Sequence, residues 1–359
     1  MNLLAIDTVP ELRDAVREAR SLRPVGARTK PGLWTAADDD VDLLDVTGIR
    51  GIVEYDPGEL TLTARAGTPI DEVQTALSEH GQYLPFDPPF AGATLGGAVA
   101  AGVSGSRAFR HGTVRNFVIG VQFVDGTGTL VRAGGKVVKN AAGFDLAKLM
   151  VGSAGRLGVL TVVSCKVLPA PPATVSVVLE FGDTGYALAA MARLAGGPVE
   201  LEALDLQPPA TLVARIGGPP QTLMASEQRV RLFAGAERTQ TVDDDGPLWH
   251  GVGELSWAPP DAQVVRVATT AHDVPTVLEW VADQPGAAVR FANAANVAWL
   301  ALPSSCRLHE LDAALESAGL SGMTLIGPPG RSLLGRRRGG AFAQRIREAL
   351  DPESRFPED

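Results

Sequence analysis

Apolar residues near the start of the chain recur with the period of a helix. Between Leu12 and Ala19 they stand three and four positions apart, the spacing of one buried helix face. Thr8 and Glu11 come just before them in the order of a capping box. We therefore predict a helix that begins after Thr8, followed by a short strand that runs into the basic, glycine-containing loop Arg23–Lys30. A second helix is predicted from Thr68 to Gly81.

Alternation of apolar and polar residues predicts strands through the rest of the chain. The strands are expected near 43–46, 51–56, 60–65, 117–124, 159–168, 175–179, 200–206, 211–215, 263–268, 287–291 and 297–301. Asp125-Gly126 is typical of a hairpin turn, and the proline-rich stretch 169–172 of a linker. Further helices are expected near 184–195, 222–233, 274–284, 307–318 and 339–350. The predicted fold class is α+β, with units at 1–172, 173–330 and 331–359, the second of which has a mixed or antiparallel sheet.

Charge and cysteine content exclude several classes of function. Thirty-two Lys and Arg against 41 Asp and Glu give a net charge of −9, which argues against nucleic acid or an anionic membrane as the main partner. Cys165 and Cys306 are too few for a disulfide scaffold, a zinc ribbon or an iron–sulfur cluster within the chain. Five histidines have no metal-ligand spacing, and no apolar run is long enough for a membrane span. We expect a cytoplasmic protein without a secretory signal, associated with a membrane only through partners.

Glycines gather between residues 85 and 158, where they permit close approach of the backbone to a ligand. A backbone-lined cradle for a diphosphate is one interpretation, and a set of tight turns is the other. The cradle is not a P-loop, because Gly135-Lys136 is followed by Val137. A Rossmann fingerprint fails too, because Gly126-Thr127-Gly128 is followed by Val at position 131.

Two glycine-rich motifs carry a resemblance to a known family. They are Thr94–Ala100 with Gly105 and Arg110-His111-Gly112, and the stretch from Lys139 to Val159. Together with the loop Pro24–Lys30, they resemble the FAD-binding core of the vanillyl-alcohol oxidase / p-cresol methylhydroxylase superfamily. The stretch Tyr83–Pro89 and the short chain are similar to the family of FAD-binding glycolate oxidase subunits of bacteria. The resemblance implies an FAD-binding domain of two α/β subdomains with an α+β cap.

The same resemblance implies which residues hold the cofactor. Residues of the loop would bind the diphosphate, 94–97 and 105 the flavin and ribityl chain, 110–112 the isoalloxazine, and 155–159 the adenine side. The implied FAD-binding residues are Pro24, Val25, Gly26, Ala27, Arg28, Thr29, Pro88, Thr94, Leu95, Gly96, Gly97, Gly105, Arg110, His111, Gly112, Gly155, Gly158 and Val159. Substitution of Gly26 by valine is expected to abolish FAD retention through a clash with the ligand rather than with the core. Because the loop lacks the histidine of covalent relatives, FAD is expected to be non-covalent.

Candidates for catalysis are weaker. Arg110 and His111 would place a cation near the flavin, or would form an exposed turn. His250 would face the substrate, or would be a surface histidine beside a core tryptophan. Asp145 is expected to cap a helix. Arg331 and the arginines at 336–338 would bind an anionic partner surface, or would be solvated charges.

The resemblance implies a subunit that oxidises a small 2-hydroxy acid, with glycolate first among the candidates. Hydride would pass from the α-carbon to flavin N5, and electrons would pass to a partner that carries iron–sulfur clusters. A second hypothesis is a non-catalytic flavoprotein that stabilises a second, catalytic flavoprotein subunit. It is favoured because the larger D-2-hydroxyacid dehydrogenases that the chain resembles carry a histidine motif in the cap, and this chain lacks that motif. A third is a reductase of cell-wall nucleotide precursors, which shares the FAD fold.

Overall fold

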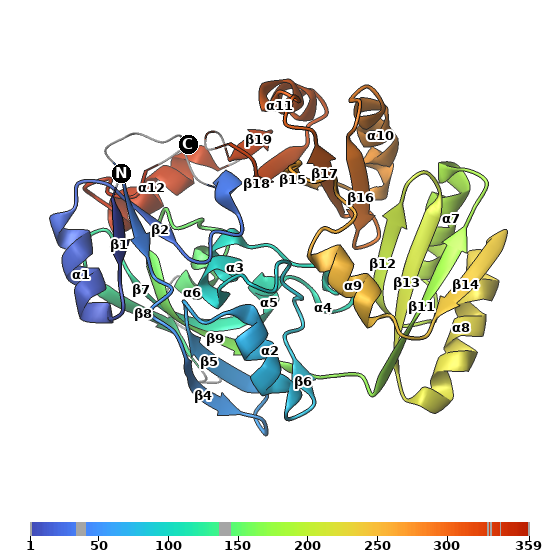
Figure 1. Ribbon diagram of the computed structural model, residues 1–359, viewed down its shortest axis with the longest axis horizontal. Helices are drawn as coiled ribbons and strands as arrows, with labels where there is room; N and C mark the ends of the chain where they lie inside the picture. Colours follow the sequence, from blue (N-terminus) through green and yellow to red (C-terminus); the bar gives the residue numbers. More distant parts are fainter. Residues whose placement is uncertain are drawn as a thin grey trace.

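The computed structural model describes residues 2–33, 41–135, 145–328, 330, 332–337 and 339–357. Two lobes lie side by side, the first built from the N-terminal residues and the second from the residues that follow the linker (Figure 1). Part of the second glycine-rich motif, residues 139–144, lies outside the described residues, as do Arg331 and Arg338.

A small parallel sheet opens the first lobe. Its order is β1 (Leu3–Ala5), β3 (Asp42–Asp45), β2 (Leu22–Val25), and helix α1 (Val9–Glu18) connects β1 to β2. The predicted capping box is confirmed, because the Thr8 side chain accepts the Glu11 amide while Glu11 accepts the Thr8 amide. Leu12 and Val16 are fully buried on the inner face of α1.

A five-stranded antiparallel sheet forms the rest of this lobe. Its order is β4 (Ile52–Asp56), β5 (Thr61–Arg65), β9 (Val159–Lys166), β7 (Val118–Val124), β8 (Leu130–Gly134). The accompanying elements are η1 (Pro31–Leu33), α2 (Ile70–Ser78), α3 (Leu95–Ala101), α4 (Ala108–His111), α5 (Val114–Phe117), α6 (Leu146–Met150) and the pair β6 (Gln82–Tyr83) and β10 (Leu168–Pro169). The predicted hairpin after β7 and the Asp145 cap of α6 are confirmed.

The second lobe is built on a nine-stranded antiparallel sheet, here called the cap sheet. Its order is β14 (Arg238–Val242), β11 (Ala173–Glu180), β13 (Thr211–Gly218), β12 (Leu201–Gln207), β16 (Ala288–Ala292), β17 (Val297–Leu302), β15 (Gln263–Ala268), β18 (Ser321–Ile326), β19 (Leu333–Gly335). β19 lies beyond residue 330, where this unit was expected to end, and still pairs with β18. The predicted antiparallel or mixed sheet is therefore observed in its antiparallel form.

The two faces of the cap sheet have different partners. One face packs against α7 (Thr184–Ala195), α8 (Pro220–Ala234), α10 (Val274–Ala282) and α11 (Leu308–Ser317). From the other face Trp299 and, on β18, Leu325 join the apolar core of the first lobe. The helix α9 (Gly246–Gly253) and the turn η2 (Ala271–Asp273) complete this lobe. The cap sheet thus presents one face to its own helices and the other to the first lobe.

The C-terminal segment returns to the start of the chain. After α12 (Gly340–Leu350), the Leu350 carbonyl accepts the Gly126 amide at 2.8 Å and the Arg355 carbonyl accepts the Leu22 amide at 2.7 Å. Phe356 is 1% exposed and packs among Leu12, Leu22 and their neighbours. The last described residues therefore belong to the core beneath the parallel sheet.

Candidate functional site

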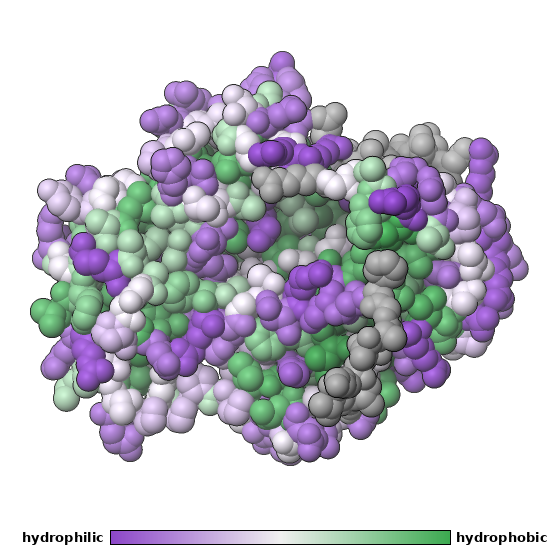
Figure 2. Space-filling model, turned by 180° about the vertical axis from the view of Figure 1, so that it is seen from behind, coloured by the Kyte–Doolittle hydropathy of each residue, from purple (hydrophilic) through white to green (hydrophobic). Residues whose placement is uncertain are grey.

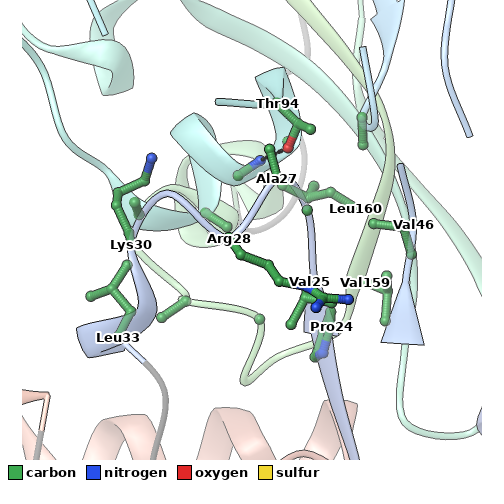
Figure 3. Close-up of a pocket in the computed structure, with 18 of the residues that line it drawn as sticks. Pro24, Val25, Ala27, Arg28, Lys30, Leu33, Val46, Thr94, Val159 and Leu160 are labelled. Carbon is green, nitrogen blue, oxygen red and sulfur yellow. Dashed lines mark hydrogen bonds between the residues drawn. The ribbon is translucent and has the colours of Figure 1, made fainter. Parts of the chain in front are cut away.

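A first cavity, open to solvent, lies where the loop after β2 meets α3 and the loop before β9. Figure 3 shows Val25, Ala27 and Arg28 on one wall, Thr94 above them, and Val159 and Leu160 from β9. Seen from behind, the molecule is hollowed near its middle, over a largely hydrophobic floor (Figure 2).

Glycines bring the loop and α3 into contact. A Cβ built on Gly26 would overlap the side chain of Thr94, and one on Gly97 would lie 2.9 Å from the same hydroxyl. Thr94 itself caps α3, because its hydroxyl accepts the Gly97 amide at 3.2 Å. Gly96 lies equally close to Ala66, at 2.6 Å between the added Cβ and the alanine methyl. The absence of side chains at these positions forms the cradle.

The backbone amides of residues 26–29 are free to bind a ligand. They line the first cavity and donate to no acceptor among the residues that the structure describes. Arg28 adopts the left-handed conformation at φ 58°, which turns the loop back on itself. Successive unsatisfied amides in such a turn form a site for an anion such as a phosphate.

The structure brings most of the predicted FAD-binding residues together. Those that line the first cavity are Pro24, Val25, Gly26, Ala27, Arg28, Thr29, Thr94, Gly96, Gly97, Gly155, Gly158 and Val159. Leu95 is the first residue of α3, and its side chain is fully buried in the core. Pro88 is half-buried in the preceding loop. Gly105 lines a different cavity, described below. Gly112 ends α4 at φ 90°.

Arg110 and His111 belong to an ion-pair cluster between the lobes rather than to the first cavity. The Arg110 guanidinium contacts Glu202 of β12 at 3.1 Å and Glu200 at 2.8 Å. His111 Nε2 lies 3.3 Å from Glu202 and 2.8 Å from the Tyr83 hydroxyl. Burial alone would raise the pKa of Glu202, but the hydrogen bond and charge of His111, with Arg110, hold it below its usual value. The two residues tie α4 to the cap sheet.

The third catalytic candidate, His250, is exposed on α9. Its neighbour Trp249 is only 9% exposed and donates its indole N–H to Ser176 at 2.8 Å. This arrangement agrees with the alternative of a core tryptophan beside a surface histidine.

A second, smaller and more enclosed cavity lies between the lobes. The first lobe contributes Gly105 and Ser106, and the second contributes Asp205, Arg290 and the three tryptophans 249, 257 and 299. Asp205 is fully buried; it accepts the Ser106 hydroxyl at 2.6 Å and Arg290 Nε at 3.2 Å. Burial raises the pKa of Asp205 in spite of the Arg290 charge. The second nitrogen of the guanidinium, Arg290 Nη2, is buried without a hydrogen-bond partner among the described residues.

Several residues of the cavities carry no sequence signal. Lys30, Leu33, Val46, Ala66, Ala100, Ala101, Ala154 and Leu160 also line the first cavity. Most are small apolar residues that a core position would use equally well. Lys30 is the last residue of the predicted loop, but it was not among the residues predicted to hold FAD.

The first cavity lies mostly in a part of the chain that is similar to known proteins. The profile of a family described as an FAD binding domain matches residues 3–134. By this match, residues 3–134 are similar to an FAD binding domain. Both the parallel sheet and the glycine cradle of α3 fall within this domain, and the first cavity lies largely on its residues. The resemblance inferred from the loop and the glycine motifs is confirmed.

Relatives of the FAD binding domain include oxidoreductases of several organisms. The chain is 54% identical over 135 residues to the glycolate oxidase subunit GlcE of Escherichia coli, which covers 37% of this chain and 39% of that protein. It is 33% identical over 158 residues to the mitochondrial D-lactate dehydrogenase [cytochrome] 1 of Saccharomyces cerevisiae, which covers 44% of this chain and 27% of the yeast protein. The matched part thus spans less than half of the length of each of these relatives.

A solved structure of alkyldihydroxyacetonephosphate synthase shares the fold with a TM-score of 0.73 at 14% identity. The match covers 98% of this chain and 74% of the other. The α+β prediction is therefore confirmed in both lobes.

FAD fits the residues of the first cavity. Free amides and a lining without carboxylates in the described residues both suit a diphosphate ligand. FAD supplies a two-electron acceptor when it is bound. Within the described ranges no three His, Cys, Asp or Glu side chains gather as a metal site, and every helix is too short or too polar to cross a bilayer.

Proposed function

We propose that this protein is an FAD-dependent subunit that oxidises a small 2-hydroxy acid, with glycolate as the first candidate. The names of the relatives, glycolate oxidase subunit and D-lactate dehydrogenase, support this class of substrate. The single observation in the structure that carries the proposal is the partnerless Arg290 nitrogen in the second cavity. A guanidinium nitrogen with unpaired N–H donors, beside a cavity lined by tryptophans, suits a carboxylate.

The residues around Arg290 give it a fixed orientation. Asp205 holds Nε at 3.2 Å, and Ser106 and the Asn293 amide hold Asp205 in turn, at 2.6 and 3.2 Å. The guanidinium also lies 6.0 Å from the ring centre of Trp249. In the proposed site Arg290 binds the substrate carboxylate, Asp205 positions Arg290, and the tryptophans exclude water.

Transfer of electrons out of the subunit is proposed to require partners. The chain has only two cysteines, which lie apart in sequence, and the word "subunit" in the names of GlcE and of the related GlcD of Bacillus subtilis supports an assembly of several chains. We propose a second flavoprotein subunit and an iron–sulfur subunit as these partners. The non-catalytic alternative, in which the chain only stabilises the second flavoprotein, predicts a complex that does not depend on Arg290.

Substitution of Arg290 by lysine tests the proposal. Lysine can still pair with Asp205, but it lacks the second planar donor. In the purified complex, we expect the concentration of glycolate or D-lactate needed for half-maximal bleaching of the bound FAD to rise roughly tenfold or more. Arg238→Lys, at an 82% exposed side chain of the same sheet, is the matched control. An Arg290→Lys complex with unchanged FAD content and unchanged bleaching would contradict the assignment and favour the scaffold role.

A further inference from the structure

The charges that line the first cavity are unbalanced. Among the described residues that line it, only Arg28 and Lys30 are ionisable, and both are basic. Arg28 is compensated, because its guanidinium lies 3.4 Å from Asp45, and its side chain is 40% exposed. Lys30 is not compensated in this way.

Lys30 is a buried cation without a counter-ion among the residues that the structure describes. It is 8% exposed, its ammonium hydrogen-bonds the Thr29 hydroxyl at 3.0 Å, and it lies 5.2 Å from the ring centre of Phe90. Within the described part of the chain it contacts no carboxylate. Neither a hydroxyl nor an aromatic face neutralises a buried ammonium.

No carboxylate on the described elements around Lys30 pairs with its ammonium. β18, which packs on η1 next to Lys30, has no ionisable side chain, and Arg266 on the adjacent β15 is itself basic. On the Phe90 loop, Asp87 lines the second cavity, and Glu254 of α9 accepts the Ala91 amide at 2.6 Å. Burial is the one resolved cause that lowers the pKa of Lys30, to about 8.

We propose that the Lys30 ammonium is the counter-ion of the FAD diphosphate, so that FAD binding is coupled to the protonation of this side chain. The ligand supplies the negative charge that the protein leaves out, on the same loop whose amides are free. The inference rests on the FAD binding domain and is independent of the substrate proposed above.

The coupling fixes the direction of the pH dependence. Without ligand, part of the Lys30 population is neutral near pH 8, whereas a bound diphosphate raises the pKa and favours the ammonium. FAD binding therefore takes up a proton above about pH 8. Affinity should be constant well below pH 8 and should fall by up to about tenfold per pH unit above it.

The experiment compares three full-length variants stripped of FAD. Flavin or nucleotide binding is titrated from about pH 7 to about pH 9.5, and calorimetry in buffers of different ionisation enthalpy counts the protons taken up. We expect Lys30→Met to bind FAD roughly tenfold or more weakly and without this pH dependence. Lys30→Arg should keep most of the affinity but take up no proton. Lys166→Met removes an exposed lysine at the end of β9 and should match the wild type.

Two probes separate the diphosphate from the flavin. ADP carries the diphosphate without the flavin, so Lys30→Met should weaken its binding, whereas riboflavin binding should not change. A loss confined to riboflavin would overturn the assignment to the diphosphate, and proton uptake that persists in Lys30→Arg would assign the coupling to another group. If Lys30→Met fails to fold by circular dichroism, the loss of proton uptake in Lys30→Arg remains the deciding result.

Discussion

Gly26 and Thr94 lie so close that a Cβ at position 26 would overlap the threonine hydroxyl. The contact joins the loop after β2 to Thr94, the N-cap residue of α3. Bulk at Gly26 therefore meets the protein itself, and the expectation that it would meet only the ligand is wrong.

Substitution of Gly26 by valine should remove FAD and also destabilise the apoprotein by about 1–3 kcal/mol, because the side chain overpacks the loop against α3. Thermal unfolding of the stripped protein and flavin content after purification measure the two effects. Pairing Gly26→Ala with Thr94→Gly should recover much of the lost stability, since glycine is a tolerated cap. A double variant no more stable than Gly26→Ala would argue that the contact is not the cause.

Glu202 should make the link between the lobes sensitive to acid. Because its pKa lies below the usual value, it stabilises the folded state when ionised, and this contribution is lost as pH falls through the lowered pKa. Glu202→Gln should therefore lower the free energy of unfolding at neutral pH by on the order of 1–3 kcal/mol, and its stability should approach that of the wild type in strong acid. Glu200→Gln is the control, since its 80% exposed side chain contacts the same arginine. Parallel melting curves for Glu202→Gln and wild type across the acid range would refute this role.

His250 should have no part in the reaction. It is exposed on α9, outside the residues that line either cavity. His250→Ala should retain FAD, and its free energy of unfolding should lie within about 0.5 kcal/mol of the wild-type value. Its bound FAD should be bleached by substrate at the wild-type rate. A large drop in bleaching with normal FAD content would restore it as a catalytic candidate.

Activity should depend on partners while folding and FAD binding should not. Each lobe has its own buried apolar cluster, so the isolated chain should fold and bind FAD. It should show little glycolate oxidation with an artificial acceptor, and activity should appear when a second flavoprotein and an iron–sulfur subunit are co-expressed. An isolated chain as fast as the complex would mean that it is an autonomous dehydrogenase.

Local patterns predicted the elements that depend on local forces. The helix after Thr8, the strand 117–124 with its hairpin, and the helices α7, α8, α10 and α11 could be predicted from the sequence, whereas α9 was not predicted. Capping, alternation and turn residues act within a few positions. The strand β14 was not predicted because its residues are polar and lie at a sheet edge. Helix α3 was not predicted because it contains two adjacent glycines, which are poor helix formers. Tertiary packing decides both cases.

The candidate site also contains some features that depend on nearby residues and others that depend on distant ones. The glycine cradle is a backbone property and could be located from the motif around Thr94. The contacts of Arg110 and His111 with Glu200 and Glu202 could not be predicted, because these partners come about 90 residues later in the sequence. Lys30 has no carboxylate partner among the described residues because of how distant segments pack around it. No local pattern in the sequence predicts this.

The return of the C-terminal segment has a consequence for the order in which the protein becomes competent. Phe356 completes the core that supports the parallel sheet, and the Arg355 carbonyl satisfies the amide of Leu22 at the start of β2. The strand that leads into the diphosphate loop is thus braced by residues made more than 300 positions later. A ribosome that has produced only the N-terminal lobe carries a nascent chain without this brace. We therefore expect FAD to bind only after residues 355 and 356 have been made, and chains that end before them should be purified without bound flavin.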